Sequence, residues 1–122
     1  MPAASAPPAS GGMVPAVELN VSSRSQGDHV VVTAAGEIDL YTAPKLQADL
    51  AGIIDATPAA RVVIDMSGVE FCDSTGMNVL LSALRQVRER GGELELAAPR
   101  PAVMKILQVT GLDTVFTISP AV

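Results

Sequence analysis

The sequence is poor in aromatic side chains, in histidine and in cysteine. Aromatic residues make up 2% of the 122 residues, and histidine and cysteine occur once each, as His29 and Cys72. So few aromatics offer no platform on which nucleic-acid bases could stack, and the net charge of -5 disfavours binding to a phosphate backbone. One histidine and one cysteine, far apart in the chain, do not form a metal-ligand cluster. The sequence therefore predicts no nucleic-acid partner, no metal and no cofactor.

The sequence also shows no membrane-spanning apolar run and no secretion signal. No apolar run approaches the length of a membrane-spanning helix, and the first Lys or Arg is Arg24, so no charged signal-peptide region precedes it. Cys72 has no second cysteine with which to form an internal disulfide. We therefore expect a cytoplasmic protein that has no membrane partner.

The composition that remains is that of one globular domain. The hydrophobic fraction is 48%, enough for an aliphatic core in a chain of this length. Residues 1–15 are rich in Pro, Ala, Ser and Gly and carry no charge or apolar periodicity, so they are expected to form a disordered tail. The domain is then expected over residues 16–122.

The apolar periodicity along this domain predicts an α/β fold. Alternation at Val17, Leu19 and Val21 indicates an edge strand, and a turn at residues 26–28 joins it to a second strand over residues 29–35. The pattern then predicts a helix from about residue 43, a buried strand over 61–66, a helix from about 74 to 90, a strand over 93–97 and a helix from about 101 to 110. Residues 115–118 are expected to form either a last strand or an extended tail. Strands joined through helices lie parallel by right-handed crossovers, so we expect a mixed sheet whose opening hairpin is antiparallel.

The segment 71–77 lies between the buried strand and the longest helix. Asp73 and Ser74 are both residue types that cap helix N-termini, where unpaired backbone N–H groups point outward. A hydroxyl at such a point is a suitable place for a phosphate. The stripe expected to face the core on this helix is Met77, Leu80, Leu81, Leu84 and Val87.

No catalytic residue can be assigned from the sequence. Ser74 lacks a Gly-x-Ser-x-Gly elbow, His29 is the only candidate base, and no P-loop occurs. Asp65 ends an apolar run as a phosphoacceptor aspartate would, but it has no accompanying acidic pair and is interpreted as a turn residue before Ser67-Gly68. The chain is therefore predicted not to be an enzyme.

Two motifs carry a resemblance to a known family. Asp73-Ser74-Thr75-Gly76 closely resembles the Asp-Ser-Ser/Thr-Gly signature of bacterial anti-sigma factor antagonists, which are single STAS domains. Gly36-Glu37-Ile38-Asp39, followed by Thr42-Ala43-Pro44, resembles their Gly-Glu-Leu-Asp segment and the start of their first helix. The resemblance extends from about Val17 to Ile118 and implies the mixed sheet packed with helices that the periodicity also predicts.

The resemblance also implies a function and a set of site residues. Unphosphorylated, the protein would bind an anti-sigma factor serine kinase and release a sigma factor; phosphorylated at Ser74, it would dissociate, and a PP2C-type phosphatase would restore it. Thr75 would be structural, Asp39 would lie near the partner surface, and Asn78, in place of a frequent Gly, could alter partner choice. The expected partner-binding residues are Glu37, Asp39, Asp73, Ser74, Thr75, Gly76, Met77 and Asn78.

Other interpretations of the same residues stay open at this point. Asp73 and Ser74 can act only as helix caps, which is common. The domain could be a STAS interaction module of a stressosome or of a transport-system assembly. It could also be a small-molecule or nucleotide-binding STAS domain, although no phosphate-cradling loop supports that alternative.

Overall fold

The computed structural model describes residues 19–57 and 61–121, so the tail expected over residues 1–15 lies outside the described residues. Strands and helices alternate after an opening hairpin, in the order that the periodicity predicts. The elements are β1 (Leu19–Gln26), β2 (His29–Ile38), α1 (Ala43–Asp55), β3 (Arg61–Cys72), α2 (Ser74–Glu89), β4 (Glu93–Ala97), α3 (Pro101–Val109), the short 3-10 helix η3 (Leu112–Thr114) and β5 (Thr117–Ser119).

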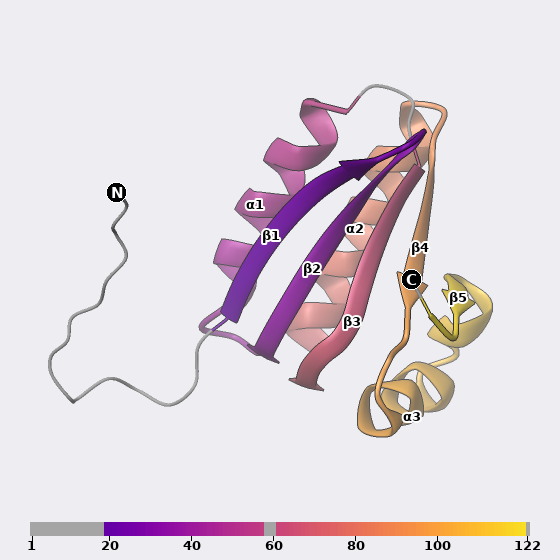
Figure 1. The fold of residues 1–122 in the computed structure, drawn as a ribbon. Coiled ribbons are helices and arrows are strands. Elements are labelled where there is room, and N and C mark those ends of the chain that lie inside the picture. Colours follow the sequence, from indigo (N-terminus) through magenta and orange to yellow (C-terminus); the bar gives the residue numbers. More distant parts are fainter. Residues whose placement is uncertain (1–18, 58–60, 122) are drawn as a thin grey trace, which may run out of the picture.

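The strands form one mixed sheet in sequence order, β1-β2-β3-β4-β5 (Figure 1). β1 and β2 are antiparallel and are joined by the turn at Gly27, whose φ of 66° suits a glycine. Each later strand is parallel to its neighbour, because a helix returns the chain to the same end of the sheet. The predicted fold class, with its antiparallel hairpin followed by parallel strands, is confirmed.

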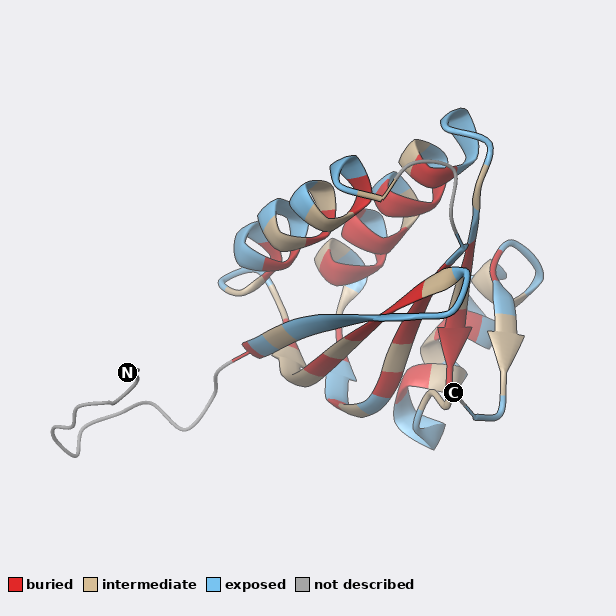
Figure 2. Cartoon of the chain, turned by 45° about the horizontal axis from the view of Figure 1, so that its top comes forward, coloured by how far each residue is buried: buried red, intermediate tan, exposed pale blue. Residues whose placement is uncertain are grey.

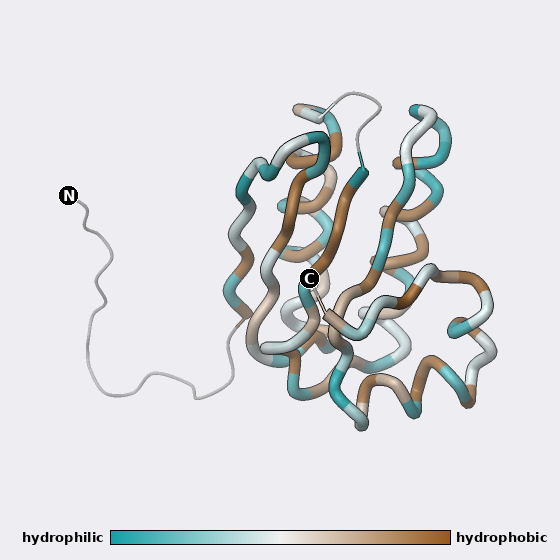
Figure 3. The backbone as a smooth tube through the Cα atoms, turned by 45° about the vertical axis from the view of Figure 1, so that its right-hand side comes forward, coloured by the Kyte–Doolittle hydropathy of each residue, from teal (hydrophilic) through white to brown (hydrophobic). Residues whose placement is uncertain are grey.

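The core lies between the sheet and the helices. α1 and α2 lie side by side on one face of the sheet, and their buried residues face the strands (Figure 2). Alternate residues of the central strands, such as Val32, Ile64 and Leu96, are fully buried in this core. Figure 3 shows continuous apolar stretches in the central strands, because residues between these positions, such as Val31 and Val63, are buried in a second, smaller cluster. The core is almost wholly aliphatic, as the shortage of aromatics requires.

β3 is longer than the pattern of apolar residues predicts. Ser67 and Gly68, expected to form a turn, lie inside the strand at a shift in register between β2 and β3. The Asp65 carboxylate accepts a hydrogen bond from the Ser67 N–H at 3.0 Å, and a Cβ at Gly68 would lie 2.9 Å from the Cβ of Ala35. At this shift in register Gly68 pairs with Ala35, and because glycine has no side chain the two strands stay paired without a clash. As a result β2 and β3 both extend to the end of the sheet where α2 begins.

The buried face of α2 differs slightly from the predicted stripe. Leu80 and Leu84 are buried as expected, whereas Leu81 is only partly buried at the margin of the core. Val79 and Ala83, which the stripe left out, are buried instead. α1 packs against this side of α2 and covers the smaller residues. Leu81 therefore packs against the core as the stripe predicts, but it lies at the edge and stays partly exposed.

Candidate functional site

Only one residue separates β3 from α2. Asp73 follows the last residue of the strand, and Ser74 is already the first residue of the helix. The backbone of Asp73 is extended (φ -92°, ψ -174°), and its N–H donates to the carbonyl oxygen of Ile38 at 3.0 Å. Its carboxylate accepts from the N–H of Gly76 at 3.0 Å. Asp73 is therefore the N-cap of α2, and the exposed Ser74 is free of that role.

Gly76 allows the helix to begin this close to the sheet. A Cβ built on Gly76 would lie 2.4 Å from Cγ2 of Ile38 and 2.7 Å from Sγ of Cys72, which is too close for any side chain. Gly76 and its neighbour Met77 are both buried. Their assignment to a partner-binding surface is therefore corrected: they pack into the core and hold Ser74 at the surface.

Cys72 lies beside the candidate site, but its thiol is buried and poorly reactive. Its side chain is fully buried, and burial, followed by the negative charge of Asp73, raises the pKa of the thiol to about 12. Because the thiolate is the reactive form, such a thiol is a poor nucleophile near neutral pH. At this junction the Ser74 side chain is exposed, whereas Cys72 serves packing.

A second turn, between β2 and α1, adjoins the first. Asp39 accepts hydrogen bonds on Oδ1 from the N–H groups of Tyr41 at 2.9 Å and Thr42 at 3.0 Å. The Thr42 hydroxyl accepts from the N–H of Asp39 at 2.9 Å and donates to the carbonyl oxygen of Glu37 at 2.8 Å. The carboxylate of Asp39, a predicted site residue, thus stabilises the turn between β2 and α1. Thr42 precedes the helix as predicted, but its side chain makes no capping bond to α1.

A shallow groove of about 260 Å³ runs between the first turns of α1 and α2. The residues that line it are Leu40, Ala43, Pro44, Gln47, Thr75, Asn78, Val79 and Ser82. Thr75 and Asn78 come from the predicted set, Asp39 lies on the neighbouring turn, and Glu37 is near the end of β2. A larger hollow of about 500 Å³, lined in part by Arg24 and Thr57, lies between β1 and the C-terminal half of α1 and so is remote from Ser74.

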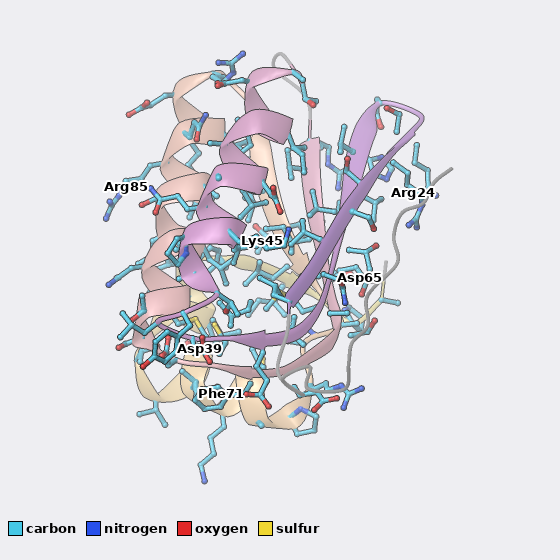
Figure 4. All side chains as sticks on the ribbon, turned by 90° about the vertical axis from the view of Figure 1, so that its left-hand side faces the viewer. Arg24, Asp39, Lys45, Asp65, Phe71 and Arg85 are labelled. Atoms are coloured by element: carbon cyan, nitrogen blue, oxygen red, sulfur yellow. The ribbon has the colours of Figure 1, made fainter. Side chains whose placement is uncertain are left out.

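Three large apolar side chains are exposed in the segments that end β2 and β3, and one of them, Leu40, lines the groove. The exposed fraction is 62% for Leu40, 87% for Tyr41 and 43% for Phe71. Figure 4 shows Asp39 and Phe71 at the same end of the molecule, where β2 and β3 finish. Sequence reasoning missed these three residues. The signal that could have found them is a pair of large apolar residues, Leu40 and Tyr41, in a turn that otherwise holds polar residues.

The structure keeps Ser74 and His29 apart. His29 begins β2, where its ring nitrogen Nδ1 lies 3.2 Å from the carboxylate of Asp28. β2 runs parallel to β3, and His29 pairs with Arg61 at the start of that strand, whereas Ser74 follows its end.

Across residues 19–57 and 61–121, no three His, Cys, Asp or Glu side chains gather closely enough to hold a metal ion. Nor is any helix in those two segments long and apolar enough to cross a membrane.

Comparison with known proteins agrees with this architecture. The family profile of the STAS domain matches residues 20–122. The anti-sigma-B factor antagonist of Listeria monocytogenes is 34% identical over 102 residues, which cover 84% of this chain and 88% of that protein. That of Bacillus subtilis is 31% identical over 103 residues, covering 84% and 93%. The crystal structure of an anti-sigma factor antagonist from Mycobacterium paratuberculosis has a TM-score of 0.78 at 30% identity and covers 86% of this chain and 88% of its own.

The mixed sheet and the helices packed on it are the fold of these proteins. The chain belongs to the STAS domain family. Its relatives over most of its length are named anti-sigma factor antagonists, so the resemblance drawn from Asp73–Gly76 and Gly36–Asp39 is confirmed.

Proposed function

We propose that this protein is an anti-sigma factor antagonist switched by phosphorylation of Ser74. In its unphosphorylated form it binds an anti-sigma factor that has serine kinase activity, and the sigma factor is released. The kinase transfers the γ-phosphoryl group of ATP to the Ser74 oxygen; the hydroxyl proton passes to a base of the kinase and ADP leaves. A PP2C-type phosphatase hydrolyses the phosphoserine and restores the active form. ATP and its metal ion belong to the kinase.

The observation that carries this proposal is that Asp73 caps α2 while the neighbouring Ser74 is exposed. Asp73 makes the capping hydrogen bond to Gly76, so the Ser74 hydroxyl can be modified without removing the cap. Ser74 is exposed at the first position of α2, where the partial positive charge of the helix terminus favours a phosphate by about 0.3–1 kcal/mol. The nearby carboxylate of Asp73 opposes it. The two effects are small and opposite in sign, so the domain should stay folded when modified.

Binding responds far more strongly than folding. Phosphorylation adds roughly -1.5 to -2 charges at pH 7. A kinase that reaches Ser74 holds nucleotide phosphates beside it, so the new group would be desolvated against charges of its own sign. Burial of an uncompensated charge costs several kcal/mol, and each 1.4 kcal/mol is about tenfold in affinity. Phosphorylation of Ser74 is therefore expected to leave the domain folded and to dissociate the complex with the kinase.

Intact-mass spectrometry tests the proposed chemistry. The wild-type chain is incubated with ATP, Mg²⁺ and each anti-sigma factor kinase of its source organism, and we expect one added phosphoryl group from the cognate kinase. Ser74→Ala should stay unmodified, while Thr75→Ala should be modified like the wild type. If Thr75→Ala abolishes the modification and Ser74→Ala retains it, the switch lies on the other hydroxyl. If no kinase modifies the wild type, the proposed switch is wrong.

A further inference from the structure

The turn between β2 and α1 displays two large apolar side chains to solvent. Tyr41 is 87% exposed and Leu40 is 62% exposed, although removing large apolar side chains from water is favourable. Tyrosine is also among the residues that most often dominate the energy of protein–protein interfaces. Two neighbouring side chains of this kind, left in water next to a phosphoacceptor serine, point to a role in binding.

The backbone that carries this pair is fixed in advance. Oδ1 of Asp39 accepts from the N–H groups of Tyr41 and Thr42, and the Thr42 hydroxyl ties the same turn to the carbonyl of Glu37 at 2.8 Å. A turn held by these bonds loses little backbone freedom when a partner covers it. Preorganisation of this kind raises affinity because less conformational entropy is lost on binding.

The turn is joined to the Ser74 junction directly. The carbonyl of Ile38, two residues before Leu40, accepts the hydrogen bond from the N–H of Asp73 at 3.0 Å. Leu40 and Thr75 line the same groove. Phosphoryl transfer needs the reacting atoms to approach within roughly 3–3.5 Å. Since the two segments adjoin, we expect a kinase that brings its nucleotide that close to the Ser74 oxygen to cover the β2–α1 turn as well.

The charges around the turn indicate what the covering surface contains. Residues 37–44 and 67–78 carry four carboxylates, and that of Asp39 is bound within its own turn, so the partner meets mainly those of Glu37, Glu70 and Asp73. Two basic side chains adjoin these ranges: Lys45 pairs with Asp49, and Arg100 donates to the carbonyl oxygen of Ser67. Complementary potentials speed association and select partners. The matching surface is thus an apolar pocket flanked by basic side chains, separate from the nucleotide that faces Ser74.

We propose that Tyr41 and Leu40 are the apolar anchor by which this protein seats on its anti-sigma factor kinase, with Asp39 and Thr42 as positioning residues that hold the anchor outward. The inference rests on the proposed function, because it takes the Ser74 kinase as the occupant. It assigns binding energy to side chains outside the Asp-Ser-Thr-Gly motif. It also gives Asp39 an indirect role: its carboxylate binds its own backbone and presents Tyr41.

Titration calorimetry against the purified anti-sigma factor kinases of the source organism, with ADP present, tests the anchor. Tyr41→Ala should raise Kd by about 30-fold or more, as expected for a hot-spot residue, and Leu40→Ala by a smaller factor. Val109→Ala is the matched control, since Val109 is 77% exposed on α3, and it should change Kd by less than about twofold. All three side chains are exposed, so melting temperatures should stay close to that of the wild type.

The positioning role has its own test. Asn retains a side-chain oxygen that can accept from the N–H groups of Tyr41 and Thr42, so Asp39→Asn should keep nearly wild-type affinity, whereas Asp39→Ala should lose affinity at temperatures where it is still folded. Equal losses for both variants would show that the negative charge itself contacts the partner, and the positioning role would be wrong.

The outcomes distinguish a failure of the proposed anchor from a failure of the proposed function. If the wild type binds none of the kinases, the proposed function and the anchor are both overturned. If the wild type binds and Ser74→Glu binds weakly, but Tyr41→Ala binds as tightly as the wild type, the proposed function stands and the anchor alone is overturned.

Discussion

The carboxylate of Asp73 accepts a hydrogen bond from the backbone N–H of Gly76 at 3.0 Å. This one bond assigns the cap of α2 to Asp73, so the next residue, Ser74, does not cap the helix. The two residues are neighbours of similar size and both are common caps, yet in this structure they have different roles.

Asp73→Ala should lower the free energy of unfolding by about 0.5–2 kcal/mol, the usual cost of losing an N-cap. Ser74→Ala should lower it by much less, because the Ser74 side chain does not make the capping bond. Urea denaturation of both variants measures the difference. Asp73→Asn is the control, since its side-chain oxygen can still cap the helix. A loss at Ser74→Ala equal to that at Asp73→Ala would contradict the assignment.

Gly76→Ala should destabilise the domain by about 1–3 kcal/mol, because the new Cβ would overlap Ile38 and Cys72 at 2.4 and 2.7 Å. Gly52 in α1 is the matched control. Nothing lies within 4 Å of a Cβ at that position, so Gly52→Ala should be neutral or should stabilise by about 0.4–1 kcal/mol. Thermal or urea unfolding of the pair decides the point, and opposite signs are expected. Equal effects would show that α2 does not approach the sheet this closely.

Leu80→Ala should cost about 2–5 kcal/mol, because Leu80 is fully buried. Leu81→Ala should cost clearly less, since Leu81 is only partly buried, and Asn78→Ala should change stability by less than about 0.5 kcal/mol on the exposed side. Chemical denaturation of the three variants gives the order. If Leu81→Ala proves the most costly, the face of α2 assigned to the core is wrong.

The buried thiol of Cys72 predicts a pH dependence on the alkaline side. Its pKa rises from the usual 9.0 to about 12 in the folded state, so above pH 9 the unfolded chain releases a proton that the folded chain keeps. Stability is therefore intact below about pH 9 and is lost as the pH rises towards 12, by up to about 1.4 kcal/mol per pH unit. Cys72→Ala removes this contribution, while every other titrating group stays the same. Unfolding free energies of both proteins between pH 8 and about 10.5 should diverge in slope, and parallel slopes would contradict the burial of the thiol.

Much of this fold follows from local sequence patterns. The alternation around Val21, the run at Val62–Ile64 and the glycine after Arg90 each fix an element, because apolar spacing and a positive φ at Gly91 (82°) are local properties. The Asp73–Gly76 motif lies at the start of α2, where the helix-cap residues also predict a helix to begin.

The details that sequence reasoning missed depend on contacts between distant segments. Ser67-Gly68 has the composition of a turn, but pairing with Ala35 keeps it inside β3. Leu81 fits an apolar stripe, but the position of α1 moves the buried face towards Val79. The choice between Asp73 and Ser74 as cap depends on the extended backbone of Asp73, which its bond to Ile38 fixes. None of these can be deduced from spacing alone.

The central claim, that a charge on Ser74 releases the partner, is tested most directly by one series of affinities. Wild type, Ser74→Ala and Ser74→Glu are titrated against the cognate anti-sigma factor kinase with ADP, and the melting temperature of each is recorded. We predict that Ser74→Ala binds as tightly as the wild type and that Ser74→Glu binds at least about tenfold more weakly, although both are folded. A Ser74→Glu protein that binds as tightly as Ser74→Ala would contradict the switch and leave Ser74 as an ordinary residue of the first helical turn.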